Sequence, residues 1–287
     1  GAIKIARTYG ELNFEKKRYK IITLENSFHG RTITTVKATG QSSFHQSKFA
    51  PYPDGFSFNA IDDVYNAIDD ETVAVMIELV QGEGGVFPFD KEKIKELAKF
   101  LKENDILLII DEVQTGVFRT GEFLASNLYD IEPDIITLAK GIGGGVPMGA
   151  VITKHKDIWT AGDHGSTFGG NYLVTAAALE VLDILENLKD SGTLDETIIY
   201  FTKKLNDIFE ANRDIFITHV GLGLMRGLRV KDADTLASLI KTAFEFGVMV
   251  LKSGNNTLRF LPALTISKSE IDEGFIRLQK AIAKIKS

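Results

Sequence analysis

The sequence predicts an α/β fold followed by a smaller α+β domain. Residues 73–80 and 106–113 are short, nearly continuous apolar runs rich in β-branched side chains, typical of strands buried on both faces. Between them, apolar residues recur at helical spacing over residues 94–101, behind Asp90, a residue type that caps helices. Strand, helix and strand in this order form the repeating unit of α/β proteins. The pattern changes near residue 190, which indicates a second domain.

The other elements of the first domain follow in chain order. Apolar positions in residues 2–9 have helical spacing, and residues 19–25 resemble a strand. Two further short apolar runs predict strands over residues 135–139 and 148–153, joined by a glycine-rich connection. Residues 174–188 are strongly helical and close the domain.

The remaining residues, 191–287, predict a small α+β domain. A long amphipathic stretch over residues 193–211 leads to two short strands with a pair of glycines between them. A helix, two more short strands and a last helix follow, and the last helix begins with the capping-box pair Ser267 and Glu270. We therefore place the large domain at residues 1–190.

Composition limits the class of protein. Of the 287 residues, 44% are hydrophobic and 25% are charged, and the net charge is −6 with both signs interspersed. This balance is ordinary for a soluble globular protein and gives no basic stripe for a nucleic acid. The absence of cysteine excludes disulfides and thiolate metal sites and permits a cytoplasmic location. No apolar run reaches the roughly 18 residues of a membrane span, so we expect a cytoplasmic protein that binds no metal, nucleic acid or membrane.

Two polar residues end predicted strands where a ligand could bind. Asp111 ends an apolar strand, and ligands of parallel α/β sheets bind at that edge, although a solvated acid explains the residue equally well when it is taken alone. Lys140 ends another strand before the glycine-rich residues 141–145, which allow a tight turn. A buried lysine there would have a lowered pKa and an amine free to form a Schiff base, whereas exposure is commoner for lysine.

Six longer segments carry a resemblance to a known family. They are FHGRT (28–32), ELVQGEGG (78–85), DEVQTGVFRTG (111–121), PDIITLAKGIGGGVPMGA (133–150), HGSTFGGN (164–171) and LRFLPAL (258–264). Together with Asp111 and Lys140 they resemble the class III aminotransferases along the whole chain. The resemblance implies the fold type I architecture, with a mainly parallel central sheet in the large domain, and pyridoxal 5'-phosphate as cofactor.

The resemblance also implies which residues bind the cofactor. Lys140 would hold pyridoxal phosphate as a Schiff base and move a proton during the reaction. Asp111 would bond the pyridine nitrogen and keep it protonated. Gln114 would reach the phenolic oxygen, while Phe28 and Val113 would cover the two faces of the ring.

Four further residues come from the same segments. Glu112, in the segment DEVQTGVFRTG (111–121), is also expected to bind the cofactor. Thr167 would bond the cofactor phosphate of a neighbouring subunit, and Ser166 would lie near the substrate of that subunit. The resemblance thus implies a homodimer with a composite active site. His29 is left open between a place in this site and a structural role.

Two arginines and one acid would bind the substrates. Arg31 would bind the substrate α-carboxylate, which a planar guanidinium can pair with bidentately. Arg259 would bind the α-carboxylate of glutamate or 2-oxoglutarate. Glu83 would pair with Arg259 whenever the amino donor has no carboxylate there, because a guanidinium left unpaired in a closed site is costly.

The family's phosphate-binding stretch precedes the helix that we predict over residues 2–9. Such a stretch supplies backbone N–H groups at a helix N-terminus. We therefore expect the natural protein to begin earlier, and we expect this 287-residue chain by itself to bind the cofactor weakly.

Residues 39–41 (TGQ) and 51–56 (PYPDGF) narrow the resemblance to family members that act on N-acetylornithine. This resemblance implies transfer of the δ-amino group of N-acetylornithine to 2-oxoglutarate, a reaction of arginine biosynthesis. It also implies succinyl-diaminopimelate as a further substrate. Other members, acting on ornithine, 4-aminobutyrate or glutamate semialdehyde, remain alternatives. So does a non-catalytic relative, and so does a nucleotide-binding α/β protein, which the glycine spacing at residues 141–145 disfavours.

Overall fold

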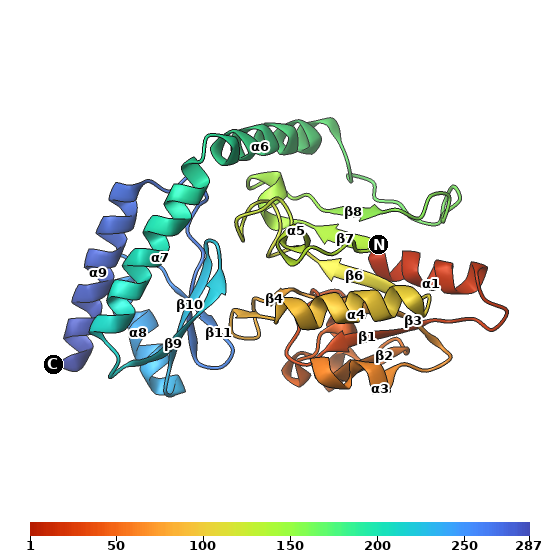
Figure 1. Ribbon diagram of the computed structural model, residues 1–287, viewed down its shortest axis with the longest axis horizontal. Coiled ribbons are helices and arrows are strands. Elements are labelled where there is room, and N and C mark those ends of the chain that lie inside the picture. The colour runs from red at the N-terminus through yellow and green to blue at the C-terminus, as the bar shows by residue number, and fades with distance from the viewer. The chain divides into compact units, whose positions relative to one another are not determined.

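The computed structural model describes all 287 residues, which form two compact units (Figure 1). The first unit comprises Gly1–Leu79, Phe89–Val117 and Leu124–Val181, and the second comprises Val80–Pro88, Phe118–Phe123 and Leu182–Ser287. Two short segments from the middle of the chain therefore belong to the same unit as the C-terminal part. The domain boundary expected between residues 190 and 191 stays a prediction.

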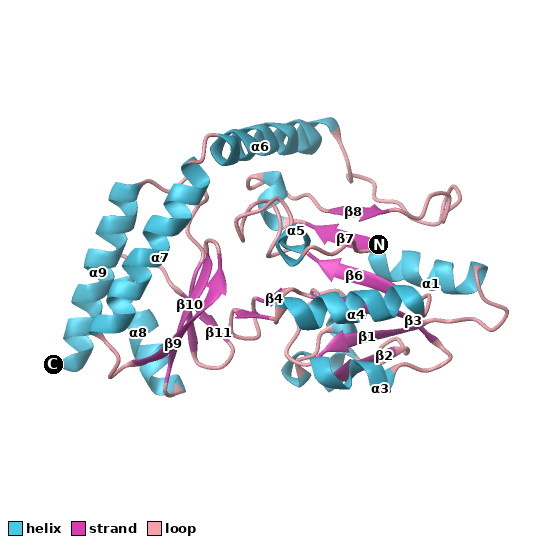
Figure 2. Cartoon of the chain, viewed as in Figure 1, coloured by secondary structure: helices cyan, strands magenta, loops and turns pink.

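The first unit contains a six-stranded sheet with the order β2-β1-β3-β6-β7-β8 (Figure 2). Neighbouring strands run parallel except for β8, which is antiparallel to β7. The predicted, mainly parallel sheet is thus confirmed. Its strands are β1 (Lys20–Leu24), β2 (Phe56–Asn59), β3 (Thr72–Ile77), β6 (Leu107–Asp111), β7 (Ile135–Leu138) and β8 (Ala150–Thr153).

Burial explains why the central strands form. Every residue of β3 and of β6 is buried, as expected of parallel strands covered on both faces. The first helix, α1 (Ala2–Leu12), packs Ile5 and Ala6 into a core cluster with Leu107 and Ile109. Removing these apolar side chains from water is the main force that holds the helix on the sheet.

The helix α4 (Lys91–Glu103) begins as the sequence predicts. The Asp90 side chain accepts a hydrogen bond of 3.0 Å from the backbone N–H of Lys93, which satisfies one free donor of the first turn. The apolar positions of the helix are buried, and the helix packs against β6. The boundary between the two units falls within α6 (Tyr172–Asp190). The other helices of the first unit are α2 (Ile33–Ala38), α3 (Val64–Ala67) and α5 (Ala125–Tyr129). Its short 3-10 helices are η1 (Ser42–Phe44), η2 (Ser47–Phe49), η3 (Ile61–Asp63) and η4 (Lys140–Gly143).

The second unit contains a four-stranded antiparallel sheet with the order β11-β12-β10-β9. Ser267 and Glu270 form the predicted capping box at the start of the last helix. The strands are β9 (Phe216–Leu222), β10 (Met225–Val230), β11 (Leu251–Ser253) and β12 (Thr257–Phe260), with a small pair β4 (Val80–Gln81) and β5 (Phe87–Pro88). The helices are α7 (Thr193–Ala211), α8 (Ala233–Glu245) and α9 (Lys268–Lys286).

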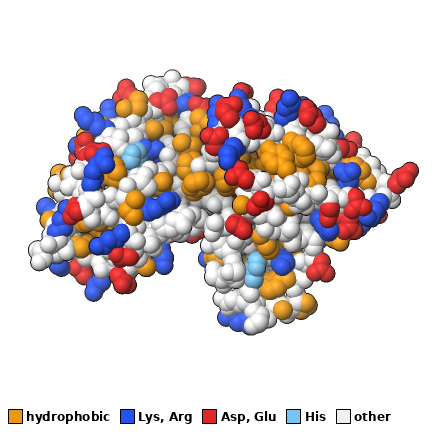
Figure 3. Space-filling view, turned by 60° about the horizontal axis from the view of Figure 1, so that its bottom comes forward, with side chains coloured by type: hydrophobic (Ala, Val, Ile, Leu, Met, Phe, Trp, Pro, Cys, Tyr) orange, Lys and Arg blue, Asp and Glu red, His pale blue; other side chains and the backbone are white.

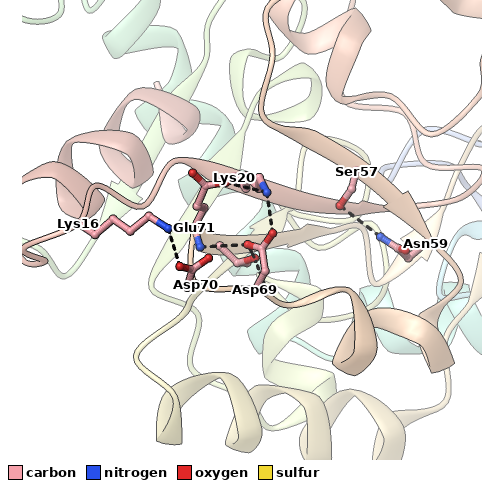
Figure 4. A network of polar contacts seen from close by, with 8 residues as sticks. Lys16, Lys20, Ser57, Asn59, Asp69, Asp70 and Glu71 are labelled. Carbon is pink, nitrogen blue, oxygen red and sulfur yellow. Dashed lines mark hydrogen bonds and ion pairs between the residues drawn. The ribbon is translucent and has the colours of Figure 1, made fainter.

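The amino edge of the first sheet carries an exposed network of ion pairs (Figure 4). The ammonium of Lys20, at the start of β1, lies 2.6 Å from Asp69 Oδ2 and 2.8 Å from Glu71 Oε2. Lys16 pairs with Asp70 beside it. These groups remain largely in water, so each pair contributes little to stability.

The face drawn in Figure 3 shows no extended region of one charge. Acidic and basic side chains are interspersed with apolar ones over the face drawn in Figure 3. None of the helices is long and apolar enough to span a bilayer. No three His, Asp or Glu side chains lie together as a metal-binding group.

Candidate active site

Four loops of the first unit leave the carboxyl edge of its sheet and carry polar residues. Phe28 and His29 follow β1, Glu78 follows β3, Asp111 ends β6 and Lys140 follows β7. Since these four strands are parallel, their carboxyl ends lie at one edge of the sheet, where α/β proteins bind ligands.

Asp111 is buried and held by three donors. Its Oδ2 lies 2.8 Å from Nδ1 of His29, and its Oδ1 accepts hydrogen bonds from the Val113 backbone N–H (3.1 Å) and the Thr137 hydroxyl (3.0 Å). Burial alone would raise the pKa of Asp111, but the bond to His29, the charge of His29 and the other two donors hold that pKa below its usual value. The carboxylate is therefore ionised and fixed in orientation.

The loop that carries His29 is held in place by its backbone. The N–H of Phe28 donates to Glu78 Oε1 (2.7 Å), and the N–H of His29 donates to the Thr39 hydroxyl (3.0 Å). Burial alone would lower the pKa of His29, yet its hydrogen bond to Asp111 and the charges of Asp111 and Glu78 raise that pKa above its usual value. The imidazole therefore lies in a negative environment inside the protein.

Phe28 and Arg31 form an aromatic and cationic cluster next to this loop. The Phe28 ring contacts Phe44 edge to face, with 5.3 Å between ring centroids. The guanidinium of Arg31 lies 5.6 Å from the Phe28 centroid and 5.3 Å from the Phe44 centroid. Arg31 itself is exposed, so its charge is accessible to an anion in solution.

The residues that follow Asp111 differ in where their side chains go. Val113 and Gln114 are half-buried. Both carboxylate oxygens of Glu112 are occupied: Oε1 accepts from the Ser126 N–H (2.8 Å), and Oε2 accepts from the Ala125 N–H (3.0 Å) and the Thr115 hydroxyl. Glu112 therefore holds the start of α5 and the loop after β6 together.

Lys140 lies at the predicted place but is not buried. It lies two residues after the end of β7, in a left-handed backbone conformation with φ of 48°, and it is exposed. The expectation of a buried Lys140 is wrong for this single chain, in which Lys140 is the first residue of η4 and is exposed. Gly144 has a positive φ of 57°, and a Cβ there would collide with Val181, so the turn requires glycine.

Ser166 and Thr167 lie in the exposed loop between β8 and α6. The Ser166 hydroxyl accepts a hydrogen bond of 3.1 Å from the N–H of Gly169, which stabilises the turn. The side chain of Thr167 is open to the surroundings. In this single chain neither residue forms a hydrogen bond with the residues that surround Asp111.

The second unit contains the other two substrate-binding candidates in contact. Arg259, on β12, is 7% exposed, and its Nη1 lies 2.8 Å from Glu83 Oε1 and donates to the Gly82 carbonyl at 3.0 Å. The ion pair that the sequence led us to expect is thus present. Glu83 is on the turn between β4 and β5, and its side chain is about one-third exposed, at 35%.

Arg119 supports the segment that follows Arg259. Its Nη1 donates to the carbonyl oxygens of Pro262 (2.6 Å) and Leu224 (3.2 Å) within the second unit. Burial lowers the pKa of Arg119 to about 10, which still leaves it charged at neutral pH. The Arg119 guanidinium therefore links the segment after β12 to the turn between β9 and β10 through hydrogen bonds.

Sequence reasoning missed four supporting residues: Thr39, Glu78, Arg119 and Thr137. Thr137 and Glu78 had a recognisable sign, since each is a polar residue in or next to an otherwise apolar strand. Thr39 and Arg119 had none, because their partners are backbone groups that only the fold brings close.

Comparisons with known proteins agree with this geometry. The family model described as aminotransferase class-III matches residues 1–282. An acetylornithine aminotransferase of Wolinella succinogenes is 56% identical over 99% of this chain and 73% of its own length. A succinylornithine transaminase of Salmonella enteritidis is 40% identical over 100% of this chain and 71% of its own length. The solved ornithine aminotransferase of Toxoplasma gondii, with partial occupancy of PLP at its active site, has a TM-score of 0.90 at 30% identity and covers 99% of this chain and 70% of that one.

The fold and the acid-lined sheet edge are those of a pyridoxal-phosphate-dependent transaminase of fold type I. The chain belongs to the class III aminotransferases.

Proposed function

We propose that this enzyme transfers the δ-amino group of N-acetylornithine to 2-oxoglutarate. The similarity at 56% identity to an enzyme named for acetylornithine supports this substrate, and the relative named for succinylornithine supports a preference for an acylated α-amine. Both compounds present a free terminal amine and a neutral amide in place of the α-ammonium group. Succinyl-diaminopimelate also carries an acylated α-amine together with a second, free amine, and is proposed as a further substrate.

The observation that carries the proposal is the ionised Asp111 carboxylate, buried at the carboxyl edge of the sheet. A carboxylate of this kind fits a protonated pyridine nitrogen, because a buried charge favours an opposite charge beside it. Pyridoxal phosphate, when bound, supplies an electron-withdrawing ring that stabilises the negative charge left when a proton leaves the substrate. Phe28 and Val113 would cover the ring, and Gln114 would bond its phenolic oxygen.

Lys140 is the proposed catalytic residue. Its amine would attach the cofactor covalently and, once displaced by the substrate, would carry a proton between two carbon atoms. Its position two residues after β7, at the same sheet edge as Asp111, supports this role. We assign Glu112 to holding the loop after β6 in place rather than to direct contact with the cofactor.

The arginines would bind the two carboxylate substrates in turn. Arg31 is exposed beside Phe28 and would bind the α-carboxylate of the amino donor. Arg259 would bind the α-carboxylate of glutamate or 2-oxoglutarate. Its contact with Glu83 supports a switch in which the acid neutralises the guanidinium during the half-reaction that has no carboxylate at that place.

We also propose a homodimer in which Ser166 and Thr167 complete the neighbouring site. Four large apolar side chains near this loop and on α6 are exposed, and burial in a dimer would remove them from water. They are Phe168 (81%), Tyr172 (95%), Leu173 (74%) and Leu179 (63%). A cytoplasmic location stays a prediction.

The substrate is tested by comparing kcat/KM for N-acetylornithine, succinylornithine, ornithine and 4-aminobutyrate with 2-oxoglutarate as acceptor. We expect both acylated donors to exceed the free diamine by at least about tenfold. A preference for free ornithine or for 4-aminobutyrate would contradict the proposal.

The composite site is tested by mixing two inactive variants. Lys140→Ala and Thr167→Ala subunits, unfolded together and refolded, would give mixed dimers with one intact site each. We expect activity to reappear in the mixture but in neither variant alone. Two variants that stay inactive when mixed, although they form mixed dimers, would show that Thr167 acts within its own subunit.

A further inference from the structure

His29 is a buried ionisable side chain to which the proposed function gives no role. Its side chain is 1% exposed, and its Nδ1 lies 2.8 Å from Asp111 Oδ2. The other ring nitrogen, Nε2, is buried and has no hydrogen-bond partner. Burying a polar atom without a partner costs free energy, and an apolar ring of similar size would avoid that cost. Packing alone therefore does not explain a histidine at this position.

The hydrogen bonds of Asp111 show what the histidine supplies. Its Oδ1 receives two donors, from Val113 and Thr137, whereas Oδ2 receives only His29. Without His29, one oxygen of a buried carboxylate would have no donor in this chain. The carboxyl group would then be less strongly fixed in orientation and easier to protonate.

The position of the imidazole is itself fixed independently of Asp111. The backbone N–H groups of Phe28 and His29 donate to Glu78 Oε1 and to the Thr39 hydroxyl, respectively. Glu78 is buried, with 3% exposure, and adds a second negative charge near the ring. The loop therefore places a ring nitrogen beside Asp111, in a position set by residues that follow one other strand, β3, and one helix, α2.

We propose that His29 is a positioning residue for the transamination reaction. It donates its Nδ1–H to Oδ2 of Asp111, and so keeps this carboxylate ionised and in one orientation for the pyridine nitrogen of the cofactor. Glu78 and Thr39 position His29. The inference rests on the proposed role of Asp111, and it adds the residues through which the fold controls that carboxylate.

The first test observes the ring in the protein without cofactor. The chain has five histidines, so a sample labelled with nitrogen-15 in histidine gives few signals, and His29→Asn identifies the signal of His29. We expect the neutral ring to keep its proton on Nδ1. A proton on Nε2, with Nδ1 bare, would overturn the proposal.

The second test measures binding of pyridoxal phosphate, at concentrations up to the millimolar range. His29→Asn retains an amide donor near the place of Nδ1, whereas His29→Phe removes the donor and His29→Gln displaces it. We expect the dissociation constant to rise by about tenfold or more in the last two variants and by less than about threefold in His29→Asn. We also expect the pH at which the absorption of the bound cofactor changes to shift only in those two variants.

A control variant separates this effect from general damage. His45 lies in the same unit, and its Nε2 bonds the Val36 carbonyl (3.0 Å), away from Asp111. We expect His45→Phe to keep the dissociation constant and the spectral pH of the unchanged protein. Equal binding by His29→Phe and the unchanged protein, or equal weakening by His29→Asn and His29→Phe, would overturn the role of His29. If the unchanged protein binds no cofactor, the proposed function fails, and the nuclear magnetic resonance experiment still decides the contact with Asp111.

Discussion

The two edges of the sheet in the first unit use charge in opposite ways. At the amino edge, Lys20 pairs with Asp69 where the side chains are 37% and 43% exposed. At the carboxyl edge, His29 pairs with Asp111 where they are 1% and 10% exposed. Water screens the first pair, so that its loss changes little. The second pair is shielded from water, and removal of either partner leaves an uncompensated group inside the protein.

This difference indicates that the buried charges, which are costly to leave unpaired, lie at the carboxyl edge, where the proposed active site is. Charged groups at the amino edge also shift one another's pKa values, raising that of Lys20 and lowering that of Asp69, but they do so at the exposed surface. At the carboxyl edge the shifted groups are buried, and buried groups with shifted pKa values are typical of catalytic and binding sites. Five substitutions test the contrast, from the largest expected effect to the smallest.

The largest effect is expected for Lys140→Ala. Loss of the amine removes both the covalent attachment and the proton carrier, and general acid–base groups alone contribute about 10²–10⁴-fold. We therefore expect transamination to fall at least that far, with little change in the free energy of unfolding because Lys140 is exposed. Lys154→Ala, which changes an exposed lysine directly after β8, is the matched control and should keep full activity. Substantial activity in Lys140→Ala would refute its role.

The second effect is expected for Asp111→Asn. The change leaves the buried His29 without its charged partner, and such losses typically cost about 3–5 kcal/mol. Urea denaturation should show this loss in the free energy of unfolding, together with weaker binding of pyridoxal phosphate. A variant as stable as the unchanged protein would mean that the buried pair contributes nothing.

The third effect concerns the second unit. Glu83→Ala removes the carboxylate from Arg259 Nη1 but keeps its hydrogen bond to the Gly82 carbonyl, and we expect the free energy of unfolding to fall by about 1–2 kcal/mol. The ratio of kcat/KM for amino donors that place an α-carboxylate at Arg259 to kcat/KM for donors that do not should change in this variant. Glu273→Ala, which removes the exposed partner of Arg277 on α9, is the control and should change neither quantity. Unchanged discrimination in Glu83→Ala would argue against the switch.

The fourth effect is a pH dependence. The pKa of Asp111 is lowered in the folded state, so its contribution is present above the usual value of 3.8 and is lost as the pH falls through the folded value. The pKa of His29 is raised, so its contribution is full below 6.5 and is lost as the pH rises through the folded value. The stability difference between the unchanged protein and His29→Asn should therefore be largest between these two pH values. A difference that is constant from pH 3 to 9 would contradict the charged pair.

The smallest effect is expected for Asp70→Asn. It makes the same chemical change as Asp111→Asn, but at the amino edge, where the Asp70 side chain is 74% exposed. We expect an unfolding midpoint within experimental error of the unchanged protein, in both low and high salt. A loss as large as that of Asp111→Asn would remove the contrast between the two edges.

Much of the fold was predictable because burial leaves a simple pattern in the sequence. The short apolar runs predicted five of the six strands of the main sheet, but not β2, whose residues are at most half-buried. Asp90 and Ser267 marked two helix starts that the structure confirms. The run over residues 73–80 was interpreted as one strand, yet β3 ends at Ile77. The chain leaves the sheet there, and Val80 already belongs to the second unit.

The sequence predicted those site residues whose type is fixed by the chemistry they perform. It did not predict the features of the site that depend on how the backbone folds. Asp111 and Lys140 stand at strand ends that the pattern located. The exposure of Lys140 depends on the direction in which η4 leaves β7, which no local pattern specifies. The hydrogen bond between His29 and Asp111 joins residues 82 positions apart, so only the pairing of β1, β3 and β6 brings them together.

The most direct test of the central claim locates the cofactor on the chain. The protein is incubated with pyridoxal phosphate, reduced with borohydride to make the attachment permanent, digested and analysed by mass spectrometry. We predict the added mass on the peptide that contains Lys140, with no specific labelling in Lys140→Ala. Labelling at another lysine with Lys140 unmodified would contradict the account.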